Sequence, residues 1–307
     1  MTEQIQMNVG APGETVWPHP CPLAQRAKWT SLNGEWQFSN GREQQYALPA
    51  AVDWHDTITV PFSPETQASG LSDPAFYSTV WYRRLWQQPG LVSGERLILH
   101  FEAVDWSTTV WVNGTRVCTH EGGYTPFSAD ITDALVARET QEVVVRAEDD
   151  PSDLAKPRGK QDWNLEPHSI WYPRTTGIWQ TVWLETVPTT RVNSFQWCSS
   201  LDRWEIGLEA MIHHDPNIGE EDAVIFLSVH LSVGPQLIAH DRYRVVAGEV
   251  HRRIALSDPG IDDYRNSLLW SPASPTLIDA ILELHDERFA ARHGSQLYGA
   301  TFSHHAG

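Results

Sequence analysis

The sequence of 307 residues predicts an all-β protein with two domains. Short runs of β-branched and aromatic residues recur along it, turn residues separate them, and no long segment has a helical period. A chain of this length suggests two domains, each able to bury a core. The strand pattern breaks at Pro188, so we expect one domain over residues 1–188, a second over 189–287, and a polar tail over 288–307.

The strand signals of the first domain are strongest in its second half. Residues 95–104 form a β-rich run, and residues 108–120 form two apolar arms around Asn113-Gly114. That dipeptide suits a type I′ turn, in which both central residues need a positive φ. Residues 142–148 predict another strand, and residues 177–187 alternate so regularly that we expect one continuous strand there.

The second domain has evenly spaced strand signals and turn residues between them, including Asp215-Pro216-Asn217 and Val233-Gly234-Pro235. This spacing predicts a small antiparallel sandwich of immunoglobulin-like size. The expected strands are 192–198, 203–212, 223–231, 236–246, 250–256 and 276–286.

Composition excludes several functional classes. The formal net charge of −17 argues against a nucleic-acid partner, because the phosphate backbone favours basic surfaces. No run approaches the length of a membrane span, and the N-terminus lacks the pattern of a signal peptide. The three cysteines, Cys21, Cys118 and Cys198, are widely spaced, so we expect free thiols, a cytoplasmic protein, and neither a metal site nor a cofactor.

The long irregular segment 149–176 is the candidate binding loop, because a loop of this length in a compact domain is usually functional. A sugar ring has an apolar face that an indole can cover and a hydroxyl rim that polar side chains can bind. The loop offers both kinds of group, although Trp163 and Trp171 would also suit packing beneath the loop. The candidate ligand-binding residues of the loop are Asp150, Asp162, Trp163, His168, Trp171 and Arg174.

Several segments, in order, resemble the non-catalytic front part of glycoside hydrolase family 2, the β-galactosidase and β-glucuronidase group. They include "SLNGEWQFS", "FYSTVWYRRLW", "FEAVDWSTTVWVNGTRV", "HEGGYTPFSADIT" and, most specifically, "GIWQTVWLE". "LWSPASPTLIDAILEL" resembles the end of that family's second domain. The resemblance implies a galactose-binding-like jelly-roll sandwich followed by an immunoglobulin-like sandwich, and a β-glycoside as ligand.

The same resemblance implies that catalysis belongs to a (β/α)₈ barrel, for which the chain has too few further residues. No asparagine directly precedes a glutamate, and Asn164-Leu165-Glu166 has a residue inserted, so we assign no catalytic residue and expect this chain alone to be inactive. The family's sugar-contacting aspartate corresponds to Asp149 or Asp150, and its asparagine corresponds to Thr79.

We therefore expect the chain to be the sugar-binding and scaffold region of a family 2 glycoside hydrolase. Its expected partners are a carbohydrate, a catalytic barrel in the intact enzyme and further copies of itself in a homo-oligomer. The alternatives are a free-standing carbohydrate-binding protein and a structural module with no ligand of its own. A downstream reading frame that encodes a barrel would separate the first interpretation from the second.

Overall fold

The computed structural model describes residues 18–41, 46–214, 224–256, 267–286 and 298–300. The chain divides into two compact units, and each is a β-sandwich. The first contains the described residues up to Pro20 and Trp29–Thr186, and the second contains Cys21–Lys28 and the described residues from Val187 onward. Within the described ranges no helix could cross a membrane.

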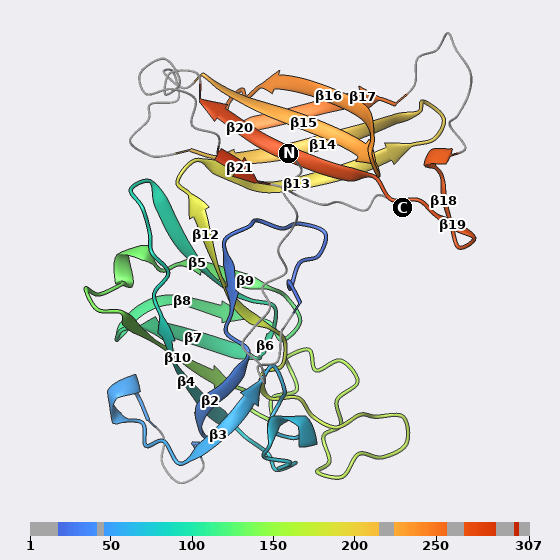
Figure 1. The fold of residues 1–307 in the computed structure, drawn as a ribbon. Coiled ribbons are helices and arrows are strands. Elements are labelled where there is room, and N and C mark those ends of the chain that lie inside the picture. The colour runs from blue at the N-terminus through green and yellow to red at the C-terminus, as the bar shows by residue number, and fades with distance from the viewer. Residues whose placement is uncertain (1–17, 42–45, 215–223, 257–266, 287–297, 301–307) are drawn as a thin grey trace. The chain divides into compact units, whose positions relative to one another are not determined.

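The first unit packs a four-stranded sheet against a six-stranded sheet (Figure 1). The four-stranded sheet has the order β1 (Trp29–Ser31), β12 (Val182–Pro188), β5 (Glu95–Phe101) and β9 (Phe127–Asp130). The six-stranded sheet has the order β3 (Asp56–Val60), β2 (Gly34–Ser39), β4 (Thr79–Gln87), β10 (Thr140–Glu148), β7 (Ser107–Val112) and β8 (Thr115–Glu121). Three short 3₁₀ turns lie at Pro49–Ala51, Gln67–Ser69 and Thr132–Ala134.

Between these sheets lies a core built by the period-2 alternation of the strands. Trp36, Phe38 and Tyr82 enter it from the six-stranded sheet, and Leu99 and Leu184 enter it from the four-stranded sheet. Full burial of such a side chain contributes about 1.5–3 kcal/mol, so this core accounts for most of the unit's stability.

The predicted hairpin is confirmed. Strands β7 and β8 pair in antiparallel register, and Asn113 and Gly114 between them have φ values of +49° and +81°. Both values fall where a type I′ turn requires them. Among the tryptophans of these strands and their edges, Trp36, Trp81 and Trp111 are buried and Trp106 is half-buried.

The expected single strand over 177–187 is wrong in one respect. The chain forms a short strand β11 (Gly177–Ile178), leaves strand geometry over 179–181, and resumes in β12. Strand β11 pairs with β6 (Val104–Asp105), whereas β12 belongs to the four-stranded sheet, so the partner changes in the middle of the run. An alternating sequence indicates which residues are buried but not which strand each half pairs with. The interruption at 179–181 could therefore not be predicted from the alternation.

The second unit packs a three-stranded sheet against a four-stranded sheet. The first has the order β13 (Arg191–Ser200), β14 (Glu205–His213) and β17 (Glu249–Ala255), and the second has the order β16 (Gln236–Arg244), β15 (Ile225–Val233), β20 (Asp279–Asp286) and β21 (Tyr298–Ala300). A short pair, β18 (Trp270–Ser271) and β19 (Ser274–Pro275), stands apart from both. The predicted strands of this region agree with these elements, while the turn at Asp215-Pro216-Asn217 lies outside the described residues.

Candidate functional site

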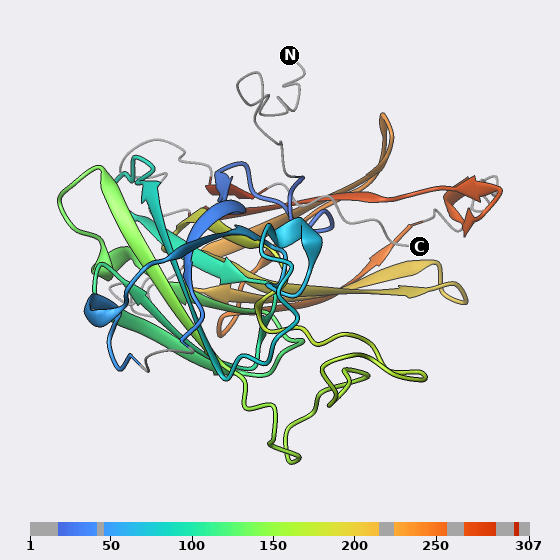
Figure 2. The same ribbon diagram turned by 90° about the horizontal axis from the view of Figure 1, so that it is seen from below.

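The segment 149–176 connects the end of β10 to the start of β11 and extends beyond the strand ends of the first unit (Figure 2). Its first residue is tied to the sheet, because the Asp149 backbone N–H donates to the Ser78 carbonyl at 3.0 Å. Thr79, the first residue of β4, pairs with Glu148, the last residue of β10. Thr79 is therefore one position from the loop, half-buried within a sheet strand.

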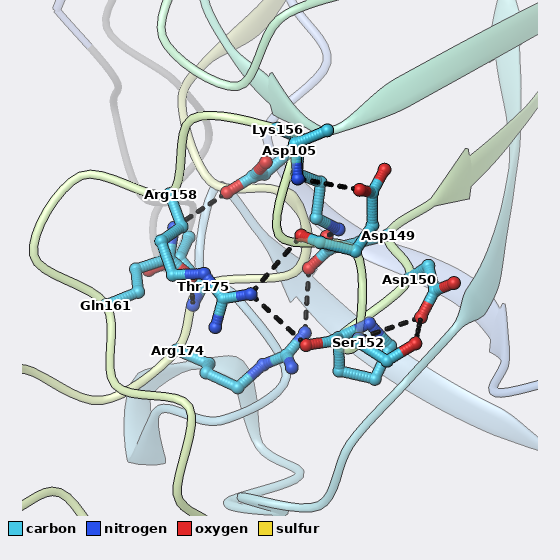
Figure 3. A network of polar contacts seen from close by, with 12 residues as sticks. Asp105, Asp149, Asp150, Ser152, Lys156, Arg158, Gln161, Arg174 and Thr175 are labelled. Atoms are coloured by element: carbon cyan, nitrogen blue, oxygen red, sulfur yellow. Dashed lines mark hydrogen bonds and ion pairs between the residues drawn. The ribbon is translucent and has the colours of Figure 1, made fainter.

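Asp149 is the buried anchor of the loop. One carboxylate oxygen accepts a hydrogen bond from Arg174 Nη2 at 2.8 Å, and the other is in direct contact with Lys156 Nζ (Figure 3). The Arg174 guanidinium also lies 4.8 Å from the ring centroid of Phe76, which adds a cation–π contact. Removal of one member of such a buried group would leave an uncompensated charge, which is strongly destabilising. Because Asp149 begins the loop and Arg174 lies near its end, their ion pair joins the two ends of the loop.

A second tie runs from the loop to Asp105 at the end of β6. The Gln161 side-chain amide donates to Asp105 Oδ2 at 2.8 Å, and its carbonyl oxygen accepts from the Thr175 N–H at 2.9 Å. Burial raises the pKa of Asp105 above its ordinary value, against the opposing effect of the Gln161 hydrogen bond. Gln161 also donates to the hydroxyl of Tyr124, which in turn donates to the Arg158 carbonyl at 3.1 Å.

A cavity of about 10 Å³ lies within this cluster, between Asp105, Asp149, Lys156, Gln161 and Arg174. That volume holds about one water molecule and excludes a sugar ring. The buried cluster is therefore a structural support, and a carbohydrate would have to contact the outer surface of the loop.

Asp149 and Asp150 differ sharply in environment, although they are adjacent in sequence. Asp149 is buried among cations, whereas Asp150 is exposed and accepts hydrogen bonds from the Ser152 N–H at 2.8 Å and its hydroxyl at 2.7 Å. Figure 3 shows the two carboxylates pointing to opposite sides of the chain. Of the two, only Asp150 is accessible to a ligand in the described part of the chain.

A separate aromatic group stands further along the loop. The indole of Trp163 is in edge contact with the ring of His168 and with the indole of Trp171, both at 5.3 Å between centroids. Trp163 is 52% exposed, so its indole does not pack beneath the loop, while Trp171 is half-buried. Beneath them lies Asp162, whose side chain is fully buried.

The carboxylate of Asp162 is held by backbone and ring donors. It accepts from the Asn164 N–H at 2.9 Å and the His168 N–H at 2.6 Å, and His168 Nδ1 lies 2.7 Å from Oδ2. Burial acts to raise the pKa of Asp162, but these donors outweigh it, so the pKa lies below its ordinary value.

Six of the eight predicted site residues fall into two groups, and Asp150 and Thr79 lie outside both. Asp149 and Arg174 belong to the buried support, and Asp162, Trp163, His168 and Trp171 belong to the aromatic group, with Asp150 exposed apart from both. Sequence reasoning missed Asp105, Lys156 and Gln161. Asp105 lies more than 40 residues before the loop, and nothing local in the sequence marks it as a partner of Gln161.

The family model for the sugar-binding domain of glycosyl hydrolases family 2 matches residues 29–188, which is half of the chain. The chain belongs to glycoside hydrolase family 2. The matched range covers nearly all of the first unit and includes the whole of the loop 149–176.

Curated relatives of this family 2 chain include a β-glucuronidase of Formosa agariphila, 28% identical over 51% of this chain and 17% of the relative. A β-glucuronidase of Paenibacillus borealis is 34% identical over 37% of this chain and 20% of the relative. The chain spans less than a third of the length of these curated relatives.

Among solved structures, the β-glucuronidase of Bifidobacterium dentium, complexed with coumarin-3-O-glucuronide, superposes with a TM-score of 0.66 at 21% identity. The superposition covers 91% of this chain and 49% of that one. The β-glucuronidase of Lactobacillus rhamnosus gives a TM-score of 0.61 at 20% identity and covers 90% of this chain and 45% of that one. These likenesses establish the succession of two β-sandwiches.

Proposed function

We propose that this family 2 chain is the non-catalytic sugar-binding and scaffold region of a glycoside hydrolase, whose chemistry resides on a (β/α)₈ barrel outside the chain. The support is the match to the family's sugar-binding domain and the names of the curated relatives, which are β-glucuronidases and β-galactosidases. We assign the ligand as a β-glycoside. A cytoplasmic location, supported by the free cysteines, and a homo-oligomer belong to the same proposal.

The loop 149–176 is the ligand-contacting edge in this proposal. The observation that carries it is the exposed indole of Trp163, held beside the buried Asp162 and the half-exposed ring of His168. The indole supplies a rigid apolar surface and the polar frame supplies hydrogen-bonding groups, which are the two kinds of group that a sugar ring can contact. Asp149 and Arg174 position the loop, Trp171 lies beside the Trp163 indole, and Asp150 adds accessible surface elsewhere on the loop.

The test is a titration of intrinsic fluorescence and of the Trp163 indole N–H resonance with methyl β-glycosides of galactose, glucuronic acid and mannose. An open surface buries little of a monosaccharide, so the dissociation constant should be on the order of millimolar. Trp163→Ala should abolish the response. Trp270→Ala is the matched control, because Trp270 is 48% exposed and lies in the second unit.

A saturable response that survives Trp163→Ala would place the ligand elsewhere. The absence of any response to all three sugars would favour a purely structural role for the loop. In either case the assignment of the ligand to this edge would be withdrawn, while membership of the family would stand.

We also propose that the first domain ends near Pro188, where β12 ends. Residues 1–188 expressed alone should unfold cooperatively, since the core of the first unit draws on strands before that residue. An insoluble or molten fragment, beside a well-folded full chain, would contradict this boundary.

A further inference from the structure

We propose that Asp162 fixes the tautomer of His168, so that its Nε2 atom accepts a hydrogen bond from a hydroxyl group of a neutral sugar stacked on Trp163. This inference rests on the proposed function and specifies the ligand chemistry of the same edge. Asp162 is a positioning residue in this account, and His168 and Trp163 contact the ligand.

The first step concerns the buried carboxylate. Asp162 has a fully buried side chain and accepts two backbone N–H groups, from Asn164 and from His168. Both donors favour the ionised form and so lower the pKa of this group, against the opposing effect of burial. The carboxylate therefore only accepts hydrogen bonds.

The second step concerns the imidazole. His168 Nδ1 lies 2.7 Å from Asp162 Oδ2, a distance that needs a proton between the two atoms. Because the carboxylate cannot supply that proton, Nδ1 carries it, and in the neutral ring Nε2 then holds a lone pair. Asn164 Nδ2 lies 3.0 Å from the same Nδ1. Because an amide nitrogen only donates, a proton on Nδ1 requires the flipped amide, with its oxygen at this place.

The third step concerns access. The His168 side chain is 46% exposed, and no hydrogen-bond partner of Nε2 occurs among the residues that the structure describes. The imidazole and the Trp163 indole meet at 79° between planes, so the two rings are not stacked face to face. A sugar that covers the open indole surface brings its rim hydroxyls to the edge of the imidazole.

The lone pair selects the ligand class. A hydroxyl donates to Nε2, whereas a carboxylate would place a second acceptor against it. The ionised Asp162 behind the ring and the net charge of −17 also disfavour an anionic sugar. The geometry therefore points to a neutral glycoside in preference to a glycuronide at this contact.

The experiment measures the affinity of the full chain for methyl β-galactoside and for two series of analogues. In the deoxy series each hydroxyl in turn is replaced by hydrogen, and in the deoxyfluoro series each hydroxyl in turn is replaced by fluorine. Fluorine can accept weakly but cannot donate. At one position both the deoxy and the deoxyfluoro sugar should bind about 3- to 10-fold more weakly than the parent, the effect of one neutral hydrogen bond. Equal affinities for the parent sugar and for every analogue would overturn the proposal.

His168→Phe keeps a flat ring beside Trp163 and removes the acceptor. It should weaken the parent sugar by the same 3- to 10-fold and abolish discrimination against the deoxyfluoro analogue. His55→Phe is the matched control, since His55 also lies near a carboxylate, 3.5 Å from Asp53, but both side chains are exposed. If His168→Phe still binds the parent sugar more tightly than the deoxyfluoro analogue, the proposal about His168 is overturned. Sugar binding that depends on Trp163 would then still support the proposed function, so the two failures can be told apart.

Nitrogen-15 NMR of the His168 ring supplies a readout that needs no ligand. The wild-type chain should have a protonated Nδ1 and an unprotonated Nε2, and Asp162→Asn should remove that bias. A proton on Nε2 in the neutral wild-type ring would refute the tautomer assignment directly, whether or not the variants fold.

Discussion

Gly177 stands at the junction of the loop with β11, and its replacement by alanine is a stringent test of the fold around the site. Its φ is +71°, a conformation that costs an L side chain about 1–2 kcal/mol. A Cβ atom at this position would overlap the Tyr82 hydroxyl oxygen and would lie 2.9 Å from Cζ and 3.0 Å from Cε2. Tyr82 is fully buried and its hydroxyl accepts the Ile178 N–H at 3.2 Å, so the ring has little room to withdraw.

The expected loss of stability combines both effects. Overpacking of a buried site costs about 1–3 kcal/mol, so Gly177→Ala should lower the free energy of unfolding by about 2–5 kcal/mol in total. Gly70→Ala isolates the backbone contribution, because Gly70 has a φ of +88° and a Cβ atom there would meet no other atom within 4 Å. That control should lose only about 1–2 kcal/mol.

Urea denaturation followed by tryptophan fluorescence measures the difference, because of the 15 tryptophans only Trp197, Trp204 and Trp270 follow Val187. With a slope of about 2 kcal/mol/M, the midpoint should fall by about 1–2.5 M in Gly177→Ala and by about 0.5–1 M in Gly70→Ala. Tyr82→Phe removes the overlapping oxygen, so the double variant should be more stable than the sum of the single effects by at least about 1 kcal/mol. Equal losses in the two glycine variants, with no coupling to Tyr82, would refute the packing argument.

Three further predictions concern activity, acidity and thiol chemistry. The isolated chain should not hydrolyse nitrophenyl β-glycosides, and turnover that survives repurification but is lost in Asp150→Asn or Glu166→Gln would contradict this. Burial raises the pKa of Asp105 in the folded state above the value of about 3.8 for the unfolded chain. The protonated Asp105 side chain therefore stabilises the fold at low pH, and this stabilisation is lost as the pH rises from about 3.8 through the pKa of the folded state. Asp105→Asn should therefore gain stability relative to wild type between pH 4 and pH 7, and a difference in unfolding free energy that is independent of pH would count against it. Burial raises the pKa of the Cys118 thiol to about 11, whereas Cys198 is exposed, so a thiol reagent at pH 8 should show a fast phase that Cys198→Ser removes and Cys118→Ser leaves.

Local features of this chain were the ones that its sequence predicted well. The Asn113-Gly114 turn is specified by two adjacent residues that tolerate a positive φ, and the alternation of β14 follows directly from one buried face. The break between β11 and β12 was not predictable in the same way, because it depends on which strand each half pairs with. Pairing between distant strands leaves no mark on a single periodic segment.

The candidate loop illustrates the same limit. Its composition indicated a surface rich in rings and polar groups, and Trp163 is indeed exposed. Asp149 is buried and Asp150 is exposed, a difference that the sequence did not reveal because adjacent residues of one type carry no signal that separates them. Asp105 was invisible because its role arises only when β6 comes to lie beneath Gln161.

The buried anchor of the loop has a bearing on how such domains diversify. Asp149 obtains both of its compensating cations, Lys156 and Arg174, from within the segment that it opens. The same cations also act on carboxylates outside the segment, since Lys156 interacts with Asp105 and Arg174 interacts with Glu65, so the segment and the sandwich share one charge balance. A replacement segment would have to keep its contacts with Asp105, Tyr124 and Glu65. Exchange of the whole segment 149–176 therefore changes the electrostatic environment of the buried Asp105 in the sandwich as well.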